Sequence, residues 1–150
     1  MKLKPRTLAR LMPLWPPFLG AGVRIKEMAE DGSRVVVTYK PTRITRNAVG
    51  TAFGGTMLSM IDPFYMLVSL YQLGEGYYIW DVGVEATFVK PGRSRVSAEI
   101  AIDPATVELI KEKTADGSKY LHWFEVDLID EEGDVVAHMR RQVYYRKKRH

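Results

Sequence analysis

A continuous apolar segment near the middle of the chain, residues 56–71, most constrains how this sequence can fold. Its apolar side chains occur on nearly all sides of the helix that it predicts, and such a helix must be buried all round. Thr56, Ser59 and Asp62 recur every three positions and therefore share one narrow stripe of the helix. The segment is shorter than the roughly 20 residues that span a bilayer. It therefore predicts a central helix enclosed by other parts of the chain.

The rest of the sequence supplies strands that can enclose this helix. Two strand-like runs, residues 22–28 and 34–39, flank a turn that contains Asp31 and Gly32, and this order predicts a β-hairpin. Apolar and polar residues then alternate along four further runs, at residues 80–88, 95–102, 122–128 and 135–145. Alternation with a period of two gives each strand one face on a core.

The order of these elements predicts an α+β fold, in which an antiparallel β-sheet is wrapped around one central helix. We expect a single domain over residues 1–150, with an N-terminal helical segment at residues 1–20 and a basic tail at residues 146–150. A sheet of this kind leaves strand edges exposed, and exposed edges invite pairing with a second subunit. A homodimer or homotetramer is therefore expected.

The N-terminal segment has its own helical signal. Its apolar residues have helical spacing and predict a short amphipathic helix that ends at the Pro16-Pro17 pair. These apolar residues are Leu8, Leu11, Met12 and Trp15. The first 20 residues contain four prolines and lack the uninterrupted apolar core of a secretory signal, so we expect a cytoplasmic protein.

The composition excludes several classes of function. The chain contains no cysteine, which excludes disulfide scaffolds, thiolate metal sites and cysteine nucleophiles. Eight basic residues lie in the first ten and last five positions, so the 14 others are outnumbered by 18 acidic residues and the segment between carries a net charge of −4. No basic face with interleaved aromatic residues is visible, and no nucleic-acid partner is expected. The three histidines have no metal-ligand spacing.

Asp62 is the most informative single residue, because it interrupts the apolar central segment. An ionised carboxylate in such surroundings must be paired, hydrogen-bonded or in contact with a cavity. Pro63 follows at once, and proline disfavours the helical conformation of the residue before it. We therefore expect a local kink that tilts the Asp62 carboxylate towards a cavity. The alternative is a structural Asp62 that satisfies a neighbouring backbone group or an arginine.

Gly54 and Gly55 begin the central segment. Glycines allow a ligand to approach the backbone closely, and the first turn of a helix presents unpaired N–H groups at the positive end of the helix dipole. These groups suit a thioester carbonyl or an oxyanion.

The pattern Asn47-x-x-Gly50-x-x-Phe53-Gly54-Gly55, followed by Asp62, resembles the signature of the hotdog thioesterase superfamily. The resemblance is closest to the branch of the phenylacetate-pathway thioesterases. Within the superfamily the chain looks most like a domain of unknown function, and the likeness covers nearly the whole chain. The segments shared with that domain are Leu14-Trp15-Pro16-Pro17-Phe18, Gly50-Thr51-Ala52-Phe53-Gly54-Gly55 and Asp62-Pro63-Phe64. The late segment Phe88-Val89-Lys90-Pro91-Gly92 is similar to the strand and turn that follow the helix in the family.

The resemblance implies an acyl-CoA thioesterase. Asp62 then activates water or attacks the thioester carbonyl directly. The Gly55 N–H polarises that carbonyl, and Asn47 orients the water or the carbonyl oxygen. The family's arrangement also implies that Asp62 and the glycine loop of two subunits face each other, so that the site is shared. No cofactor is expected beyond the CoA of the substrate.

Phe53 occupies the position of the family's usual histidine, which removes a hydrogen-bond donor and a proton carrier. Its ring is expected to line the acyl pocket instead. Cations are needed for the CoA phosphates. The residues expected to bind substrate are Phe53, Gly54, Thr51, Arg43, Arg46, Lys90 and Arg93.

The sequence leaves four hypotheses for the function, ranked in the following order. The first is acyl-CoA hydrolysis, and the second is acyl-CoA or fatty-acyl binding without turnover, which the loss of histidine at position 53 favours. A dehydratase-type hotdog enzyme ranks lower, because those enzymes resemble one another in pairing a histidine with an acid. Nucleic-acid binding through the basic ends ranks last.

Overall fold

The computed structural model of the protein describes residues 3–149; residues 1–2 and 150, which belong to the expected N-terminal segment and basic tail, lie outside it. Six strands form one antiparallel sheet in the order β1-β2-β4-β5-β6-β3. The strands are β1 (Val23–Met28), β2 (Arg34–Tyr39), β3 (Tyr77–Phe88), β4 (Val96–Ala101), β5 (Lys119–Ile129) and β6 (Val135–Lys147). The helical elements are α1 (Pro5–Leu11), the 3-10 turn η1 (Met12–Leu14), α2 (Pro16–Ala21), α3 (Gly54–Ser59), α4 (Phe64–Leu73) and α5 (Pro104–Lys113).

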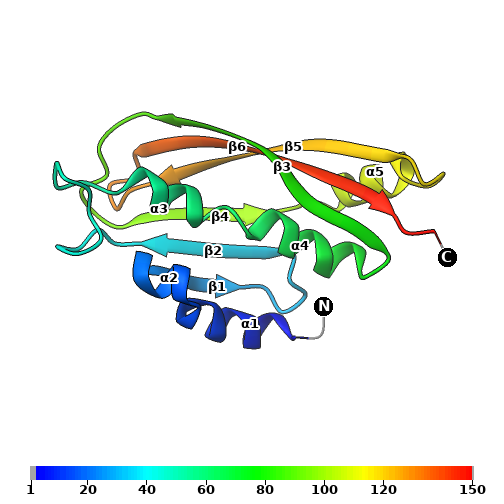
Figure 1. Ribbon diagram of the computed structural model, residues 1–150, viewed down its shortest axis with the longest axis horizontal. Coiled ribbons are helices and arrows are strands. Elements are labelled where there is room, and N and C mark those ends of the chain that lie inside the picture. The colour runs from blue at the N-terminus through cyan, green and yellow to red at the C-terminus, as the bar shows by residue number, and fades with distance from the viewer. Residues whose placement is uncertain (1–2, 150) are drawn as a thin grey trace.

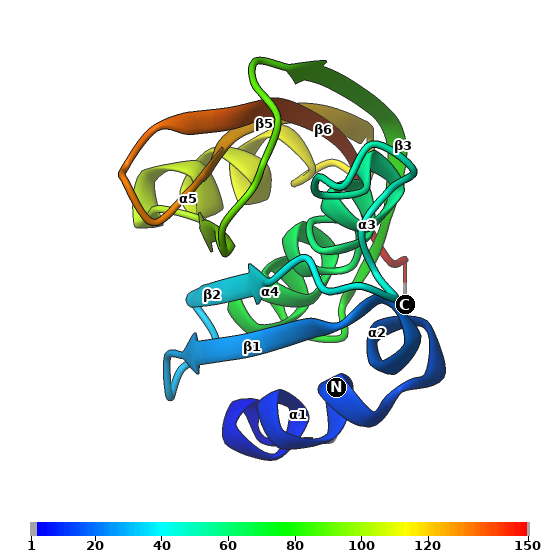
Figure 2. The same ribbon diagram turned by 90° about the vertical axis from the view of Figure 1, so that its left-hand side faces the viewer.

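The sheet curves around α3 and α4, while α1 and α2 lie beside β1 (Figures 1 and 2). Ile61, Phe64 and Val68 are fully buried between the central helices and the sheet. Alternate residues of the strands, such as Val35 and Val37, complete the core. This arrangement confirms the predicted α+β fold, in which an antiparallel sheet wraps a central helical segment. No helix among residues 3–149 is long and apolar enough to cross a membrane.

The central helical segment begins at Gly54, as the Gly54-Gly55 pair predicted. It is interrupted next to Pro63, where a kink was expected, but the interruption is a complete break: residues 60–63 separate α3 from α4, so residues 56–71 are not one helix. Pro63 explains the break, because its ring disfavours the helical conformation of the preceding residue. The Asp62 N–H still bonds the Leu58 carbonyl at 3.1 Å, so α3 ends in a tight turn that leaves Asp62 at the junction.

The N-terminal segment also differs from its prediction. The first helix ends at Leu11 rather than at the proline pair, and Pro16 begins a second helix, α2. Proline suits the first position of a helix because the N–H that it lacks has no helical partner there. The Trp15 carbonyl accepts hydrogen bonds from the N–H groups of Phe18 and Leu19 at 2.9 and 2.8 Å. Trp15 thus becomes an extended residue between two helical pieces.

Helix α5 was not predicted from the sequence. Asp103 caps its first turn by accepting a hydrogen bond from the Thr106 N–H at 2.8 Å, and Pro104 occupies its first position. An Asp followed by Pro is an ordinary signal of a helix start. At the other end of the chain, β6 runs to Lys147, so the expected basic tail begins within a strand.

Strand β3 forms one end of the sheet and is hydrogen-bonded along β6. The register shifts between Asp81 and Gly83, which places a β-bulge at Val82. Val82 and Val84 are 45% and 47% exposed, so this edge presents apolar side chains to solvent. A long apolar edge strand is a surface on which another chain can pair.

Candidate functional site

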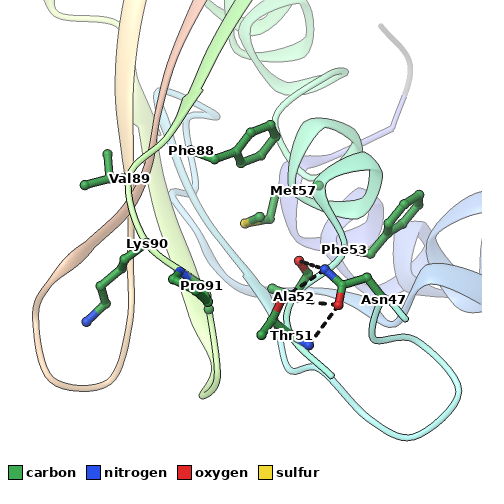
Figure 3. Close-up of a pocket in the computed structure, with 11 residues that line it drawn as sticks. Asn47, Thr51, Ala52, Phe53, Met57, Phe88, Val89, Lys90 and Pro91 are labelled. Carbon is green, nitrogen blue, oxygen red and sulfur yellow. Dashed lines mark hydrogen bonds between the residues drawn. The ribbon is translucent and has the colours of Figure 1, made fainter. Parts of the chain in front are cut away.

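The loop that precedes α3 is folded around the side chain of Asn47. Its Oδ1 accepts hydrogen bonds from the N–H groups of Val49 and Thr51 at 3.2 and 2.9 Å. Its Nδ2 donates to Thr51 Oγ1 at 2.9 Å. Figure 3 shows this amide turned towards Thr51 and Ala52. Asn47 therefore holds the glycine loop in place, and its side-chain bonds are used within that loop.

The same loop is fastened to the turn after β3, since the Ala52 N–H bonds the Gly92 carbonyl at 2.7 Å. Helix α3 then begins at Gly54. Among residues 3–149, the N–H groups of Gly54 and Gly55 have no hydrogen-bond acceptor, as is usual in the first turn of a helix. The Phe53 ring packs so closely over Gly55 that an added Cβ at Gly55 would lie 2.6 Å from Phe53 Cε1.

A cavity of about 550 Å³ opens between this loop and the end of β3 (Figure 3). It is lined by Asn47, Thr51, Ala52, Phe53, Gly54, Met57, Phe88, Val89, Lys90, Pro91 and Gly92. Five residues of the predicted site therefore lie together, at positions 47, 51, 53, 54 and 90. We call this space the loop cavity.

Asp62 lies at the junction of α3 and α4, and its side chain is 65% exposed. The carboxylate is more exposed than its apolar neighbours in the sequence suggest, because the central segment breaks at the position where a kink was expected. The carboxylate is paired: Asp62 Oδ1 accepts a hydrogen bond from Arg141 Nη2 at 2.7 Å. Of the alternatives that the sequence left open, the arginine partner and the cavity contact both apply.

Arg141 belongs to β6, and its side chain is only 7% exposed. The same Nη2 lies 3.1 Å from Asp81 Oδ2 of β3, so one guanidinium joins two carboxylates. Burial raises the pKa of Asp81, and the charge and hydrogen bond of Arg141 oppose that rise. Asp81 Oδ1 and Arg141 Nε are buried without a partner among the described residues. We call Asp62, Arg141 and Asp81 the carboxylate–arginine cluster.

The sequence reasoning missed two members of this cluster. Positions 137, 139, 143 and 145 of the last strand are apolar and face the core, and Arg141 stands among them on the same face. A charged residue in an apolar stripe requires a partner. That irregularity was the available signal for Arg141, although it does not identify Asp62 as the partner.

Asp62 and the glycine loop open onto different cavities within one chain. Asp62 and Arg141 line a second cavity of about 360 Å³, which shares no residue with the loop cavity. The other residues that line it are Trp15, Pro17, Phe18, Leu58, Ser59, Pro63 and Val84. A site that uses both Asp62 and the Gly54-Gly55 N–H groups therefore needs the two cavities to be brought together.

The cations predicted to bind CoA are placed differently from one another. Arg43, Arg46 and Arg93 are exposed. Lys90 Nζ lies 2.7 Å from Asp130 Oδ2 and 2.6 Å from Asp134 Oδ2. Figure 3 shows its side chain pointing away from Met57 and Phe53.

These carboxylates hold the pKa of Lys90 above its ordinary value. Together with Glu132 they form an acidic cluster whose oxygens lie within 4.8 Å of one another. Lys90 supplies a positive charge to this acidic cluster, and the carboxylates in turn partly neutralise the charge of Lys90.

Comparison with known proteins places this fold in a wider group. A family model described as "Domain of unknown function (DUF4442)" matches residues 5–145. No curated protein matches the sequence.

Among solved structures, a Pseudomonas aeruginosa protein of unknown function, named as a probable thioesterase, superposes with a TM-score of 0.84 at 18% identity over 99% of both chains. A Haemophilus influenzae thioesterase gives 0.70 at 16% identity, over 98% of this chain and 93% of that one. The PaaI protein of the E. coli phenylacetic acid degradation operon gives 0.65 at 16% identity, over 96% and 93%. The chain therefore belongs to the DUF4442 family and has the hotdog fold of thioesterase-like proteins.

Proposed function

We propose that the protein hydrolyses an acyl-CoA thioester, with Asp62 as the general base or the nucleophile. The observation that carries this proposal is the position of Asp62: an accessible carboxylate at a helix junction, fixed by a buried arginine and facing an apolar cavity. The names of the fold neighbours agree with a thioesterase. They do not identify the substrate or the catalytic residues.

The carboxylate is held in an orientation that suits this role. Arg141 occupies Oδ1, whereas Oδ2 has no hydrogen-bond partner among residues 3–149. Oδ2 accepts a proton from a water molecule, and the water oxygen then attacks the thioester carbonyl carbon. The C–S bond breaks, the thiolate of CoA takes up the proton, and the free acid remains. In direct attack, Oδ2 bonds to the carbonyl carbon, the C–S bond breaks and CoA leaves as the thiolate, which gives an acyl anhydride of Asp62; water then hydrolyses the anhydride to the free acid and restores the Asp62 carboxylate.

The carbonyl oxygen needs donors as negative charge develops on it, and the free N–H groups of Gly54 and Gly55 are suited to that task. Gly54 lines the loop cavity, Gly55 follows it in the first turn of α3, and neither residue lines the cavity that contains Asp62. We propose that a homodimer brings Asp62 of one protomer to the glycine loop of its partner. The apolar edge of β3, with Val82 and Val84 exposed, supports pairing of two copies there.

A two-fold dimer contains two equivalent copies of such a shared site. The exposed Arg43, Arg46 and Arg93 then remain available for the phosphates of CoA. Lys90 is a weaker candidate because Asp130 and Asp134 already neutralise its charge.

A second function is favoured by one observation. Phe53 occupies the position at which the thioesterase signature has a histidine, so the site lacks that proton carrier, and the Phe53 ring packs against Gly55. These two features favour a protein that binds acyl-CoA without hydrolysing it. Under this alternative Asp62 and Arg141 stabilise the fold and the bound thioester, and no product forms.

Hydrolysis of an acyl-CoA panel by the wild type and by Asp62→Asn distinguishes the two. Asp127→Asn is a matched control, because Asp127 is 50% exposed and pairs with His138. If Asp62 is the base or nucleophile, kcat is expected to fall by about 100-fold or more in Asp62→Asn and to stay unchanged in Asp127→Asn. Saturable binding of S-alkyl-CoA thioethers by a wild type that releases no thiol supports the second function instead. Turnover that is equal in all three proteins refutes the role of Asp62.

A further inference from the structure

The cavity beside Asp62 has walls of two different kinds. Its polar groups are the Asp62 carboxylate, the Arg141 guanidinium and the Ser59 hydroxyl. The other lining residues are apolar: Trp15, Pro17 and Phe18 of the N-terminal segment, Leu58, Pro63 and Val84. Together they enclose about 360 Å³. A largely apolar space with a few polar groups is typical of a small-ligand site.

The N-terminal wall is anchored in the core of the protein. Phe18 is 1% exposed and packs against Phe64 of α4, with ring centroids 5.9 Å apart. The Trp15 ring packs against the Phe18 ring, with centroids 5.4 Å apart and an angle of 53° between the ring planes. The start of α2 at Pro16 fixes this geometry, since Trp15 is the residue that caps the helix.

Trp15 itself is 49% exposed. A half-exposed tryptophan contributes less to the core than Phe18 does, yet it lines the cavity. Exposed large apolar side chains beside a cavity often belong to a binding site. The Trp15 indole and the Asp62 carboxylate line the same cavity, so the indole restricts the space available beside Asp62.

We infer that this cavity binds the apolar acyl group of the thioester and that Trp15 limits the length of the acyl chain. The inference rests on the proposed function, because it takes the reacting carbonyl to lie at Asp62. The ligand carbonyl then faces Asp62 and Arg141, and the alkyl or aryl part lies between Phe18 and Leu58.

The first experiment measures kcat/KM over a series of straight-chain acyl-CoA substrates for the wild type and for Trp15→Ala. Removal of the indole is expected to move the optimum to longer chains and to raise the long-to-short ratio by about tenfold or more. Leu14→Ala is the control, because Leu14 is 63% exposed, precedes Trp15 directly and does not line the cavity. Identical chain-length profiles for all three proteins overturn the inference.

The second experiment needs no turnover. In the double variant Trp80→Phe with Trp123→Phe, Trp15 is the single remaining tryptophan of the chain. Titration with an S-alkyl-CoA thioether is expected to shift its fluorescence emission, whereas CoA alone leaves the emission unchanged. Calorimetry on the same samples establishes saturation. Saturated binding with unchanged Trp15 emission overturns the inference, even where Trp15→Ala does not fold.

The two proposals fail in different ways. If a thioether shifts the Trp15 emission but the protein has no thioesterase activity, the proposed hydrolysis is refuted and the acyl site is supported. If hydrolysis depends on Asp62 but Trp15→Ala has an unaltered chain-length profile and the Trp15 emission does not shift, the acyl site is refuted and the hydrolysis is supported.

Discussion

Replacement of Arg141 by methionine removes the cation that stands between two carboxylates. The Arg141 side chain is 7% exposed and that of Asp81 is 20% exposed, so this half of the cluster behaves as a buried pair. Removal of one partner of a buried pair costs about 3–5 kcal/mol, because the other charge is left uncompensated. Asp62 is 65% exposed, and its half of the cluster contributes only about 0–1 kcal/mol. The free energy of unfolding of Arg141→Met is therefore expected to fall by about 3 kcal/mol.

The loss is expected to depend on pH. Burial raises the pKa of Asp81 above its ordinary value of 3.8, so the native state binds this proton more tightly than the unfolded state does. Its contribution to stability therefore decreases as the pH rises through the interval between the ordinary and the raised pKa. Without Arg141, which opposes the rise, the interval widens, and the deficit of the variant is smallest near pH 4 and largest at neutral pH.

Urea unfolding of the wild type and Arg141→Met across this pH range measures both effects. Arg140→Met is the control: Arg140 precedes Arg141, is 36% exposed and pairs with Glu85 and Glu125. Its loss is expected to cost at most about 1 kcal/mol. Addition of Asp81→Asn to Arg141→Met is expected to restore part of the lost stability. A deficit below about 1 kcal/mol, or one that does not vary with pH, refutes the assignment of Asp81 as the uncompensated charge.

Three further substitutions test the site. Gly92→Ala is expected to lower the free energy of unfolding by about 1–3 kcal/mol, because its Cβ would lie 3.0 Å from Ala52 Cβ; an unchanged thermal midpoint contradicts this close packing. Asn47→Ala removes the acceptor of the Val49 and Thr51 N–H groups, and faster hydrogen exchange confined to that loop is expected, whereas unaltered exchange contradicts its anchoring role. Phe53→His supplies the donor that the family signature contains, and under the proposed hydrolysis kcat is expected to rise; a lower kcat in a folded variant argues against a role for a donor at this position.

The sequence predicted the strands well because their alternation is a local property of the chain. The four runs that form β3, β4, β5 and β6 were identified from their alternation with a period of two residues. Two helical predictions were inaccurate for a local reason as well. Pro63 and Pro16 act as helix boundaries, one by interrupting the central segment and the other by starting α2.

The missing part of the site depends on contacts between residues that are distant in the chain. Asp62 and Arg141 are 79 positions apart, and no local pattern specifies that they meet. The division of the predicted site between two cavities is also a three-dimensional property. Asn47, Phe53 and Gly54 line the loop cavity, whereas Asp62 lines the second cavity, to which Trp15 also contributes. The sequence motif joins them as one pattern, although the folded chain separates them.

The most direct test of the central claim is the release of free thiol from an acyl-CoA by folded wild type and folded Asp62→Asn at equal concentration. Arg141 holds Asp62 Oδ1 at 2.7 Å and leaves Oδ2 for the reaction, so the amide variant keeps the shape of the side chain and loses the base. We expect turnover by the wild type and a decrease of about 100-fold or more in the variant. Equal turnover by the two proteins, or none by the wild type on any chain length, contradicts it.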